Sequence, residues 1–189
     1  MYNSMSKLPF IPYNILKYLA LNEEILWKLL AYNDYDALSK PDLTFDEKMD
    51  LLWKKGPQED YSVFFTALVE DAIPESKCIL KIYQYYIHAN DLYTAPTVYA
   101  FDFLFGGQMS LVEYNGVPVS RADLFVNRIL TNLNGVEVGG VGKLVFFDDM
   151  SRYDFARSVV GNSKTFTGEC LYMSVMVGDT GAEAGCGGD

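Results

Sequence analysis

Apolar residues recur at three- and four-residue intervals near the start of the chain. Between Asn14 and Tyr32 they are Ile15, Leu16, Tyr18, Leu19, Ile25, Leu26, Leu29 and Leu30. Because residues three or four positions apart share one face of an α-helix, this spacing predicts an amphipathic helix over residues 14–32. A second helix is predicted after Thr44, because Glu47 follows three positions later and completes a capping box. Gly56-Pro57 is expected to end that helix.

Two later segments alternate between two sets of side chains, as strands do. In residues 78–89, Cys78, Leu80, Ile82 and Gln84 alternate with Ile79, Lys81, Tyr83 and Tyr85. Residues 98–105 repeat this pattern, with Tyr99, Phe101, Phe103 and Phe105 on one side. The aromatic and β-branched content favours two long neighbouring strands. Turn chemistry over residues 90–96 separates them, and Gly106-Gly107 is expected to close the second.

The second half of the chain predicts one more helix and two more strands. Asn115-Gly116 indicates a tight turn, after which Ser120 with Asp123 forms an N-cap pattern. The apolar stripe of the helix that follows comprises Leu124, Ile129, Leu130 and Leu133. Asn134-Gly135 is expected to end this helix. Strands are predicted over residues 143–147 and 166–177, and the second of these alternates cleanly.

The predicted order is therefore α-α-β-β-α-β-β. It indicates an α+β fold in which a mixed or antiparallel sheet packs against about three helices. The chain has 189 residues, of which 50% are hydrophobic, and this is enough for one substantial core. We predict a single α+β domain over residues 1–177. Residues 178–189 are rich in glycine and include three acidic residues and no basic one, which predicts a flexible acidic tail.

The net charge of −10 is unevenly distributed along the chain. Residues 31–75 contain 11 acidic residues and 4 lysines, a net charge of −7. Nucleic-acid binding requires clustered lysine and arginine, so we predict no sequence-specific binding of DNA or RNA. The acidic stretch is typical of a solvated surface that keeps a protein soluble. The longest uncharged run is far shorter than a membrane-spanning helix, and we predict no membrane association.

The sequence predicts no catalytic, cofactor-binding or metal-binding residues. The one histidine, His88, follows a strand and has no neighbouring ligand or base, and metal sites draw on several such ligands. The neighbouring Asp148 and Asp149, followed by Asp154, end a predicted strand. Since adjacent strand residues point to opposite faces, the first two are not expected to converge. A serine nucleophile elbow is missing from the sequence.

The cysteine and glycine patterns also indicate that the protein has no catalytic or cofactor-binding site. Cys78, Cys170 and Cys186 are widely spaced, which is typical of free thiols in a reducing compartment. Lys77 is the one cationic neighbour expected to lower a thiol pKa, that of Cys78. The glycine-rich residues 135–142 precede a lysine but lack the pattern of a phosphate-binding loop. We predict that the protein is not an enzyme.

Three segments resemble small virion proteins of phages that infect Gram-positive bacteria. They are NILKYLA from Asn14, ILWKLLAY from Ile25 together with DALSKPDLT from Asp36, and GGVGKL from Gly139. The chain looks like a head-to-tail connector or tail-terminator protein over residues 14–177. This resemblance implies identical subunits that close into a six- or twelve-membered ring, which joins the capsid portal or neck to the tail and lets DNA pass.

The resemblance also implies the partners and the location. Copies of the chain itself and other neck, portal or tail proteins would be its partners, and it would belong to the virion after assembly in the host bacterial cytoplasm. The alternative is a non-enzymatic phage adaptor or protein-binding module that acts as a monomer or dimer. A carboxylate-dependent enzyme is the third reading.

Two sequence features fit ring assembly. Closing a ring requires each subunit to present two different complementary patches. Phe101, Phe103 and Phe105 are candidates for such contacts, although plain core packing is the preferred reading of these residues. The acidic stretch from Asp34 to Glu75 would repel passing DNA if it lined the lumen of a ring.

Overall fold

The computed structural model describes residues 5–67, 77–88, 94–140, 142–147, 159–161 and 164–178. The helices are α1 (Ile11–Asn22), α2 (Ile25–Ala31), α3 (Phe45–Asp50) and α4 (Arg121–Leu133). Short 3-10 turns are η1 (Met5–Phe10), η2 (Ala37–Ser39), η3 (Gln58–Asp60) and η4 (Gly107–Met109). The strands are β1 (Val63–Phe64), β2 (Ile79–Ile87), β3 (Thr94–Gly106), β4 (Leu111–Tyr114), β5 (Val117–Ser120), β6 (Val145–Phe146), β7 (Val159–Gly161) and β8 (Lys164–Gly178). The predicted α+β class is confirmed.

One mixed sheet forms the centre of the fold. Its strand order is β1-β2-β3-β8-β6, and β7 also pairs with β8. β1 runs parallel to β2, while the other pairs are antiparallel. The long strands β3 and β8 pair over their whole shared length, from Thr94 opposite Gly178 to Gly106 opposite Phe166. The predicted strand over residues 143–147 is shorter than expected, because β6 has only two residues.

A separate hairpin, β4–β5, follows β3. Its turn is made by Asn115 with φ of 53° and Gly116 with φ of 78°, as a two-residue hairpin turn requires. The predicted tight turn is confirmed, but the two strands that flank it were not predicted. They are only four residues long and lie outside the main sheet.

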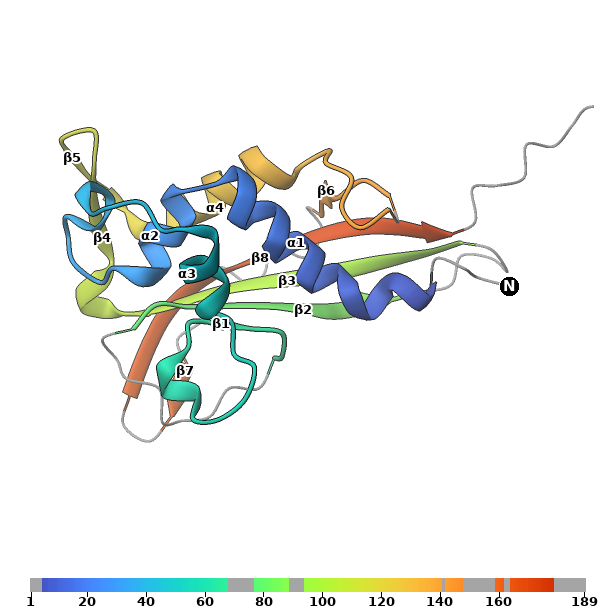
Figure 1. The fold of residues 1–189 in the computed structure, drawn as a ribbon, viewed down its shortest axis with the longest axis horizontal. Coiled ribbons are helices and arrows are strands. Elements are labelled where there is room, and N and C mark those ends of the chain that lie inside the picture. The colour runs from blue at the N-terminus through green and yellow to red at the C-terminus, as the bar shows by residue number, and fades with distance from the viewer. Residues whose placement is uncertain are drawn as a thin grey trace, which may run out of the picture.

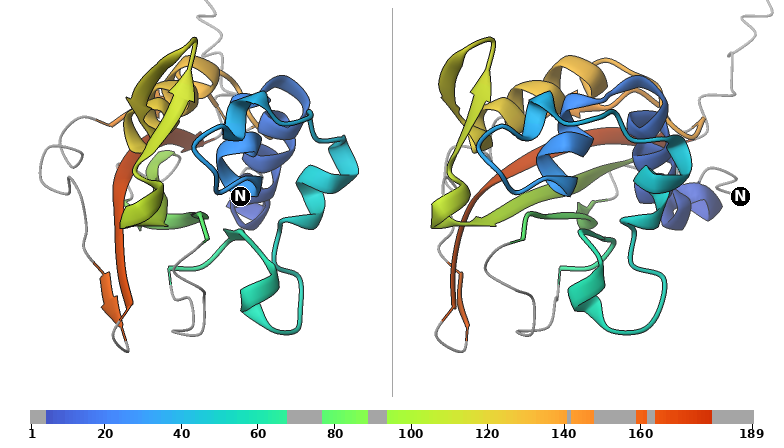
Figure 2. Two further views of the ribbon diagram at one scale, coloured as in Figure 1. Left: turned by 90° about the vertical axis from the view of Figure 1, so that its left-hand side faces the viewer. Right: turned by 60° about the vertical axis from the view of Figure 1, so that its left-hand side comes forward.

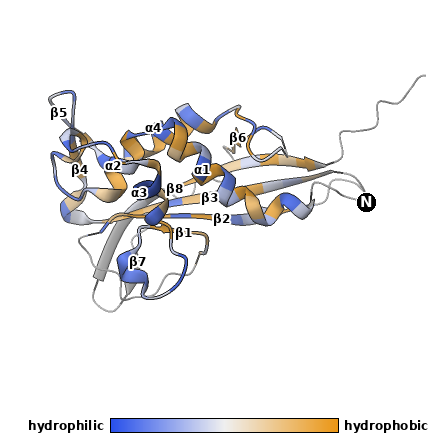
Figure 3. Ribbon diagram, in the orientation of Figure 1, coloured by the Kyte–Doolittle hydropathy of each residue, from blue (hydrophilic) through white to orange (hydrophobic). Residues whose placement is uncertain are grey.

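Helices α1, α2 and α4 lie on one side of the sheet (Figures 1 and 2). The side chains of Phe101, Phe103 and Phe105 point into this layer and are at most 3% exposed. Phe103 stacks on Phe125 of α4 with ring centroids 4.3 Å apart. Apolar residues accordingly follow the strands and the helices that cover them (Figure 3). Because the three β3 phenylalanines are buried in the core, they are excluded as subunit contacts.

The predicted single helix over residues 14–32 is wrong, because the chain breaks at Glu23. α1 begins earlier than expected, at Ile11, and ends at Asn22, after which Glu23 is extended with φ of −134° and ψ of 138°. The Glu23 carboxylate then accepts a hydrogen bond from the backbone N–H of Leu26 at 3.2 Å. The break thus lets one buried side chain cap the start of α2.

The predicted caps are confirmed, but one predicted helix end is wrong. Thr44 and Glu47 form a complete capping box at the start of α3. The Ser120 side chain accepts from the N–H of Asp123 at the start of α4. α3 ends at Asp50 instead of at Gly56-Pro57, because the chain turns to bridge Leu52 with Val63 beside β1.

Candidate interaction surfaces

The residues proposed from the sequence for chemistry do not form a site where they are described. Within the described ranges, no group of three or more His, Cys, Asp or Glu side chains is placed to hold a metal ion. His88 follows β2, is exposed, and stacks on Tyr86 with ring centroids 6.1 Å apart. The glycine-rich segment 135–142 leads into strand β6, and not into the helix that a phosphate-binding loop requires. Asp148, Asp149 and Asp154 lie outside the described residues.

The cysteines Cys78 and Cys170 are buried, as expected of small core residues. Burial raises the pKa of the Cys78 thiol to about 11, and the nearby Arg121 guanidinium only partly offsets this effect. The expectation that Lys77 lowers this pKa is therefore wrong. The Lys77 ammonium instead donates to the Glu59 carbonyl at 2.5 Å. Cys186 and the predicted tail beyond Gly178 lie outside the described residues.

Arg121 anchors the β4–β5 hairpin to the helical layer. Its side chain is fully buried, and its guanidinium donates to four backbone carbonyls. These belong to Met109 at 2.9 Å, Leu29 at 2.8 Å, Tyr32 at 3.0 Å and Asp34 at 2.9 Å. Two of the carbonyls come from the C-terminal end of α2, where the helix dipole favours a positive charge. The hairpin is thus fixed against α2 by a buried guanidinium that donates to four backbone carbonyls.

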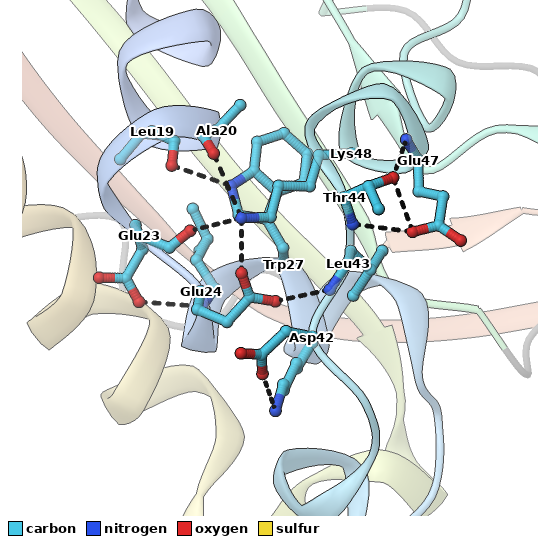
Figure 4. A network of polar contacts seen from close by, with 12 residues as sticks. Leu19, Ala20, Glu23, Glu24, Trp27, Asp42, Leu43, Thr44, Glu47 and Lys48 are labelled. Atoms are coloured by element: carbon cyan, nitrogen blue, oxygen red, sulfur yellow. Dashed lines mark hydrogen bonds and ion pairs between the residues drawn. The ribbon is translucent and has the colours of Figure 1, made fainter.

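Ion pairs connect the acidic stretch to α1 and α2. The Lys48 ammonium pairs with Glu24 at 2.5 Å and also donates to the carbonyls of Ala20 and Glu23 (Figure 4). Lys28 pairs with Asp42 at 2.6 Å. These contacts connect α3 to the break between α1 and α2. Lys48 and Asp42 of this stretch therefore help to hold it against the helices.

Side chains on the other face of the sheet form rows across β2, β3 and β8. One row consists of Lys81, Asp102 and Cys170, and the next of Tyr83, Ala100 and Tyr172. A third row, Tyr86, Val98 and Ser174, continues to Val145 of β6. In the first row, the Lys81 ammonium pairs with the Asp102 carboxylate at 2.9 Å, and both side chains are at least 89% buried. The Tyr83 hydroxyl donates to the same carboxylate at 3.1 Å.

This face is covered at one end and exposed at the other. Near β1, Trp53, Tyr61 and Phe64 pack over Ile79 and Leu104. At the opposite end, four large apolar side chains are exposed by 42 to 51%. We call them the tip patch: Tyr85, Tyr86, Val145 and Met176. Their rows place Tyr86 and Val145 at the two sides of the same face.

The two edges of the sheet beside the tip patch differ. β1 covers β2 only at Leu80 and Lys81, so residues 84–87 form an exposed edge without a strand partner among the residues that the structure describes. The edge of β6 is closed, because the chain leaving α4 hydrogen-bonds along it. The bonds are Leu144 N–H to Val136, Gly135 N–H to Leu144 and Phe146 N–H to the Asn134 side chain. Of these two edges, the β2 edge is therefore the one that can accept a further strand.

A second exposed patch surrounds the β4–β5 hairpin. Tyr35, Leu111 and Val117 are 48 to 54% exposed, and we call them the hairpin patch. The N–H of Glu113 donates to the Tyr35 carbonyl at 2.8 Å, which joins the two segments of the patch. Beside it lies an open cavity of about 340 Å³, lined by Ile25, Asp36, Leu38, Ser39, Glu113, Tyr114 and Asn115.

The β4–β5 hairpin lies at one end of the long axis of the molecule, and β2 and β8, which carry Tyr85, Tyr86 and Met176 near their C-terminal ends, extend toward the other end (Figure 1). β3 leads from Thr94 beside the tip patch to Gly106 before the hairpin, and 13 strand residues span about 40 Å. Sequence reasoning did not identify either patch. The signal at the tip is the Tyr85-Tyr86 pair, where a β-bulge between Gln84 and Tyr86 interrupts the alternation.

A protein-family model described as YomW matches residues 22–175 of the chain. No curated protein and no solved structure shows significant similarity to it. In the described part of the chain, the helices are too short and too polar to cross a membrane.

Proposed function

The chain belongs to the YomW family, a name that states no activity, and we propose that it is a non-enzymatic structural subunit of a phage neck or tail. In this role its copies join head to tail into a ring between the capsid portal or neck and the tail, through which DNA passes. The resemblance of three sequence segments to connector and tail-terminator proteins supports the virion setting. The presence of two different exposed patches, one on the main sheet and one around the separate β4–β5 hairpin, supports the assembly.

A closed ring of identical subunits needs a heterologous contact, in which one surface meets a different surface of the next copy. The tip patch and the hairpin patch are such a pair, because they differ in shape and belong to different elements. Tyrosine side chains are enriched at protein interfaces, and an exposed aromatic cluster on one face of a sheet is typical of a contact surface. We therefore place the contact between the tip patch of one copy and the hairpin patch of the next.

The proposed ring also gives the acidic stretch a role, which is to repel DNA. Asp46, Glu47 and Asp50 of α3 are exposed, although Asp50 pairs with Lys54. Carboxylates that face the lumen of a ring would repel DNA phosphates and keep the genome from adhering. We propose that α3 lies on the lumen side. An assembled ring with α3 on its outer surface would rule this out.

Native mass spectrometry tests the assembly directly. The wild-type chain is expected to form a discrete species at a multiple of 21.3 kDa, either alone or with neck and tail proteins added. Tyr86→Glu in the tip patch and Val117→Glu in the hairpin patch should each leave a monomer, because a charge would be buried at the contact. Leu21→Glu is the matched control, since Leu21 is 66% exposed on α1 and belongs to neither patch. A wild-type chain that stays monomeric under all these conditions would refute the ring.

The open β2 edge supports a second candidate, an adaptor that works as a monomer or dimer. Residues 84–87 could accept an extended strand of a partner by backbone hydrogen bonds. This candidate predicts a small species under all conditions, together with strong protection of these amides from hydrogen exchange when the partner is added.

A further inference from the structure

We infer that the cavity beside the hairpin receives a lysine side chain from the tip end of the neighbouring copy. This inference rests on the proposed head-to-tail assembly and assigns the polar contact at its centre. The cavity offers two kinds of surface. Ile25, Leu38 and Tyr114 supply apolar walls, while Asp36 and Glu113 supply carboxylates. A lysine side chain has the matching form, an aliphatic stem that packs on apolar surface and an ammonium head that binds carboxylates.

The charges around the cavity leave a negative balance. Lys40 lies near Asp36 at 3.1 Å and Asp34 at 3.7 Å, and these carboxylates raise the pKa of the Lys40 ammonium. Glu113 has no ion pair within the described ranges. The Arg121 guanidinium is also close in the fold, but it is buried and engaged with carbonyls. The three carboxylates, of which Asp36 and Glu113 line the cavity, therefore outnumber the two cations, the half-buried Lys40 ammonium and the buried Arg121 guanidinium, and one further cation balances the charge.

The tip end carries the opposite charge. Lys7 and Lys143 are both exposed, and Lys7 donates to the carbonyl of Gly140 at 3.2 Å. The two lysines thus belong to one corner of the molecule, and Lys143 is two residues from Val145 of the tip patch. Within the described ranges, Glu137, which bridges to Lys143 through the backbone, is the acidic residue in this corner. The described residues of the corner are thus net positive, so charge complementarity selects a second copy of this chain as the occupant of the cavity.

Charge reversal in two separate sets of variants tests the contact. The pocket variant combines Asp36→Lys with Glu113→Lys, and the tip variant combines Lys7→Glu with Lys143→Glu. Each alone should assemble at least about tenfold more weakly than the wild type, because like charges then meet at every contact. A one-to-one mixture of the two variants should assemble again, with alternating copies, since each remaining contact then joins opposite charges. The control variant, Asp46→Lys with Asp50→Lys, changes the net charge equally on exposed α3 and should assemble as the wild type does.

Native mass spectrometry resolves these outcomes, with circular dichroism to show that each variant is folded. The lysine contact is supported if the mixture assembles while neither reversed variant assembles by itself. If the wild type assembles and both reversed variants assemble equally well, the ring stands and this inference is overturned. If the pocket variant loses only the binding of another virion protein while self-assembly persists, the occupant is that protein and the inference is likewise overturned. If the wild type never assembles, the proposed function itself fails.

Discussion

Glu23 and Arg128 are 105 positions apart in the sequence and form a two-pronged ion pair in the fold. The guanidinium Nη2 lies 2.5 Å from one carboxylate oxygen, and Nε lies 3.0 Å from the other. The Glu23 side chain is completely buried, and Asn132 donates to it as well, at 2.6 Å. Hydrogen bonding to Glu23 raises the pKa of the Arg128 guanidinium. This pair holds α4 against the break between α1 and α2.

Glu23→Gln should destabilise the fold strongly, because it leaves Arg128 without its counter-charge. Removing one partner of a buried pair costs about 3 kcal/mol, and the partial exposure of Arg128 keeps the loss near that lower value. Urea unfolding followed by circular dichroism measures it. Asp50→Asn is the control, since its pair with Lys54 is exposed and should contribute less than about 0.5 kcal/mol. Similar losses of stability in both variants would show that the buried Glu23–Arg128 pair contributes no more to stability than an exposed pair does.

Arg121→Met should loosen the hairpin before it unfolds the rest. Four carbonyls would lose their donor, two of them in buried and two in part-buried hydrogen bonds, and at about 1 kcal/mol for each the total cost is about 4 kcal/mol. Arg121→Lys should not restore the stability, because one ammonium cannot reach all four acceptors. Hydrogen exchange should then show amides of residues 111–120 losing protection ahead of those of β3. Unchanged protection of the hairpin in Arg121→Met would contradict its role as an anchor.

The Cys78 thiol should make stability depend on alkaline pH. Its pKa is raised from 9.0 to about 11 in the folded chain, so unfolding releases its proton. The free energy of unfolding is therefore undiminished below pH 9 and falls as the pH rises from 9 to about 11. Two pKa units correspond to about 3 kcal/mol at most.

Urea unfolding at several pH values measures this slope, and Cys78→Ala should reduce it. Burial also raises the pKa of Tyr99, which acts in the same direction. Both chains therefore carry Tyr99→Phe in the comparison. An equal slope with and without the thiol would mean that Cys78 does not cause it.

Gly168→Ala should be among the most damaging single substitutions. A Cβ at this position in β8 would overlap the carbonyl oxygen of Phe103, a backbone atom that is held in the sheet and cannot move away. We expect a loss of more than about 3 kcal/mol or no folded protein. Gly107→Ala is the matched control, because its Cβ would meet nothing within 4 Å. The yield of soluble protein and its melting temperature distinguish the two.

Local signals in the sequence predicted most of the fold. The capping pair Thr44 and Glu47 and the turn Asn115-Gly116 act through neighbouring backbone groups, so their effects can be read from short segments. The break at Glu23 could not be predicted this way. Its cause is a contact with Arg128 in a distant helix, and the apolar spacing continues across it.

The surfaces proposed for assembly were beyond sequence reasoning for a related reason. Phe103 and Tyr86 both lie in aromatic strand segments, yet one is fully buried and the other is 50% exposed. Alternation assigns side chains to two faces, but it does not show which face the helices cover or where that cover ends. The cavity joins Asp36 to Glu113, which come together only when the hairpin folds back on α2.

The position of β8 has a consequence for synthesis. This strand lies between β3 and β6, although it is the last of the described strands along the chain. During translation, one edge of β3 stays unpaired until β8 has been synthesised. This takes several seconds at usual elongation rates of about 5–20 residues per second. A product that ends before β8 would keep this strand edge unpaired and would be prone to aggregation and proteolysis. Only translation through β8 therefore completes the sheet, so the strand order itself links the folded state to synthesis of this last described strand.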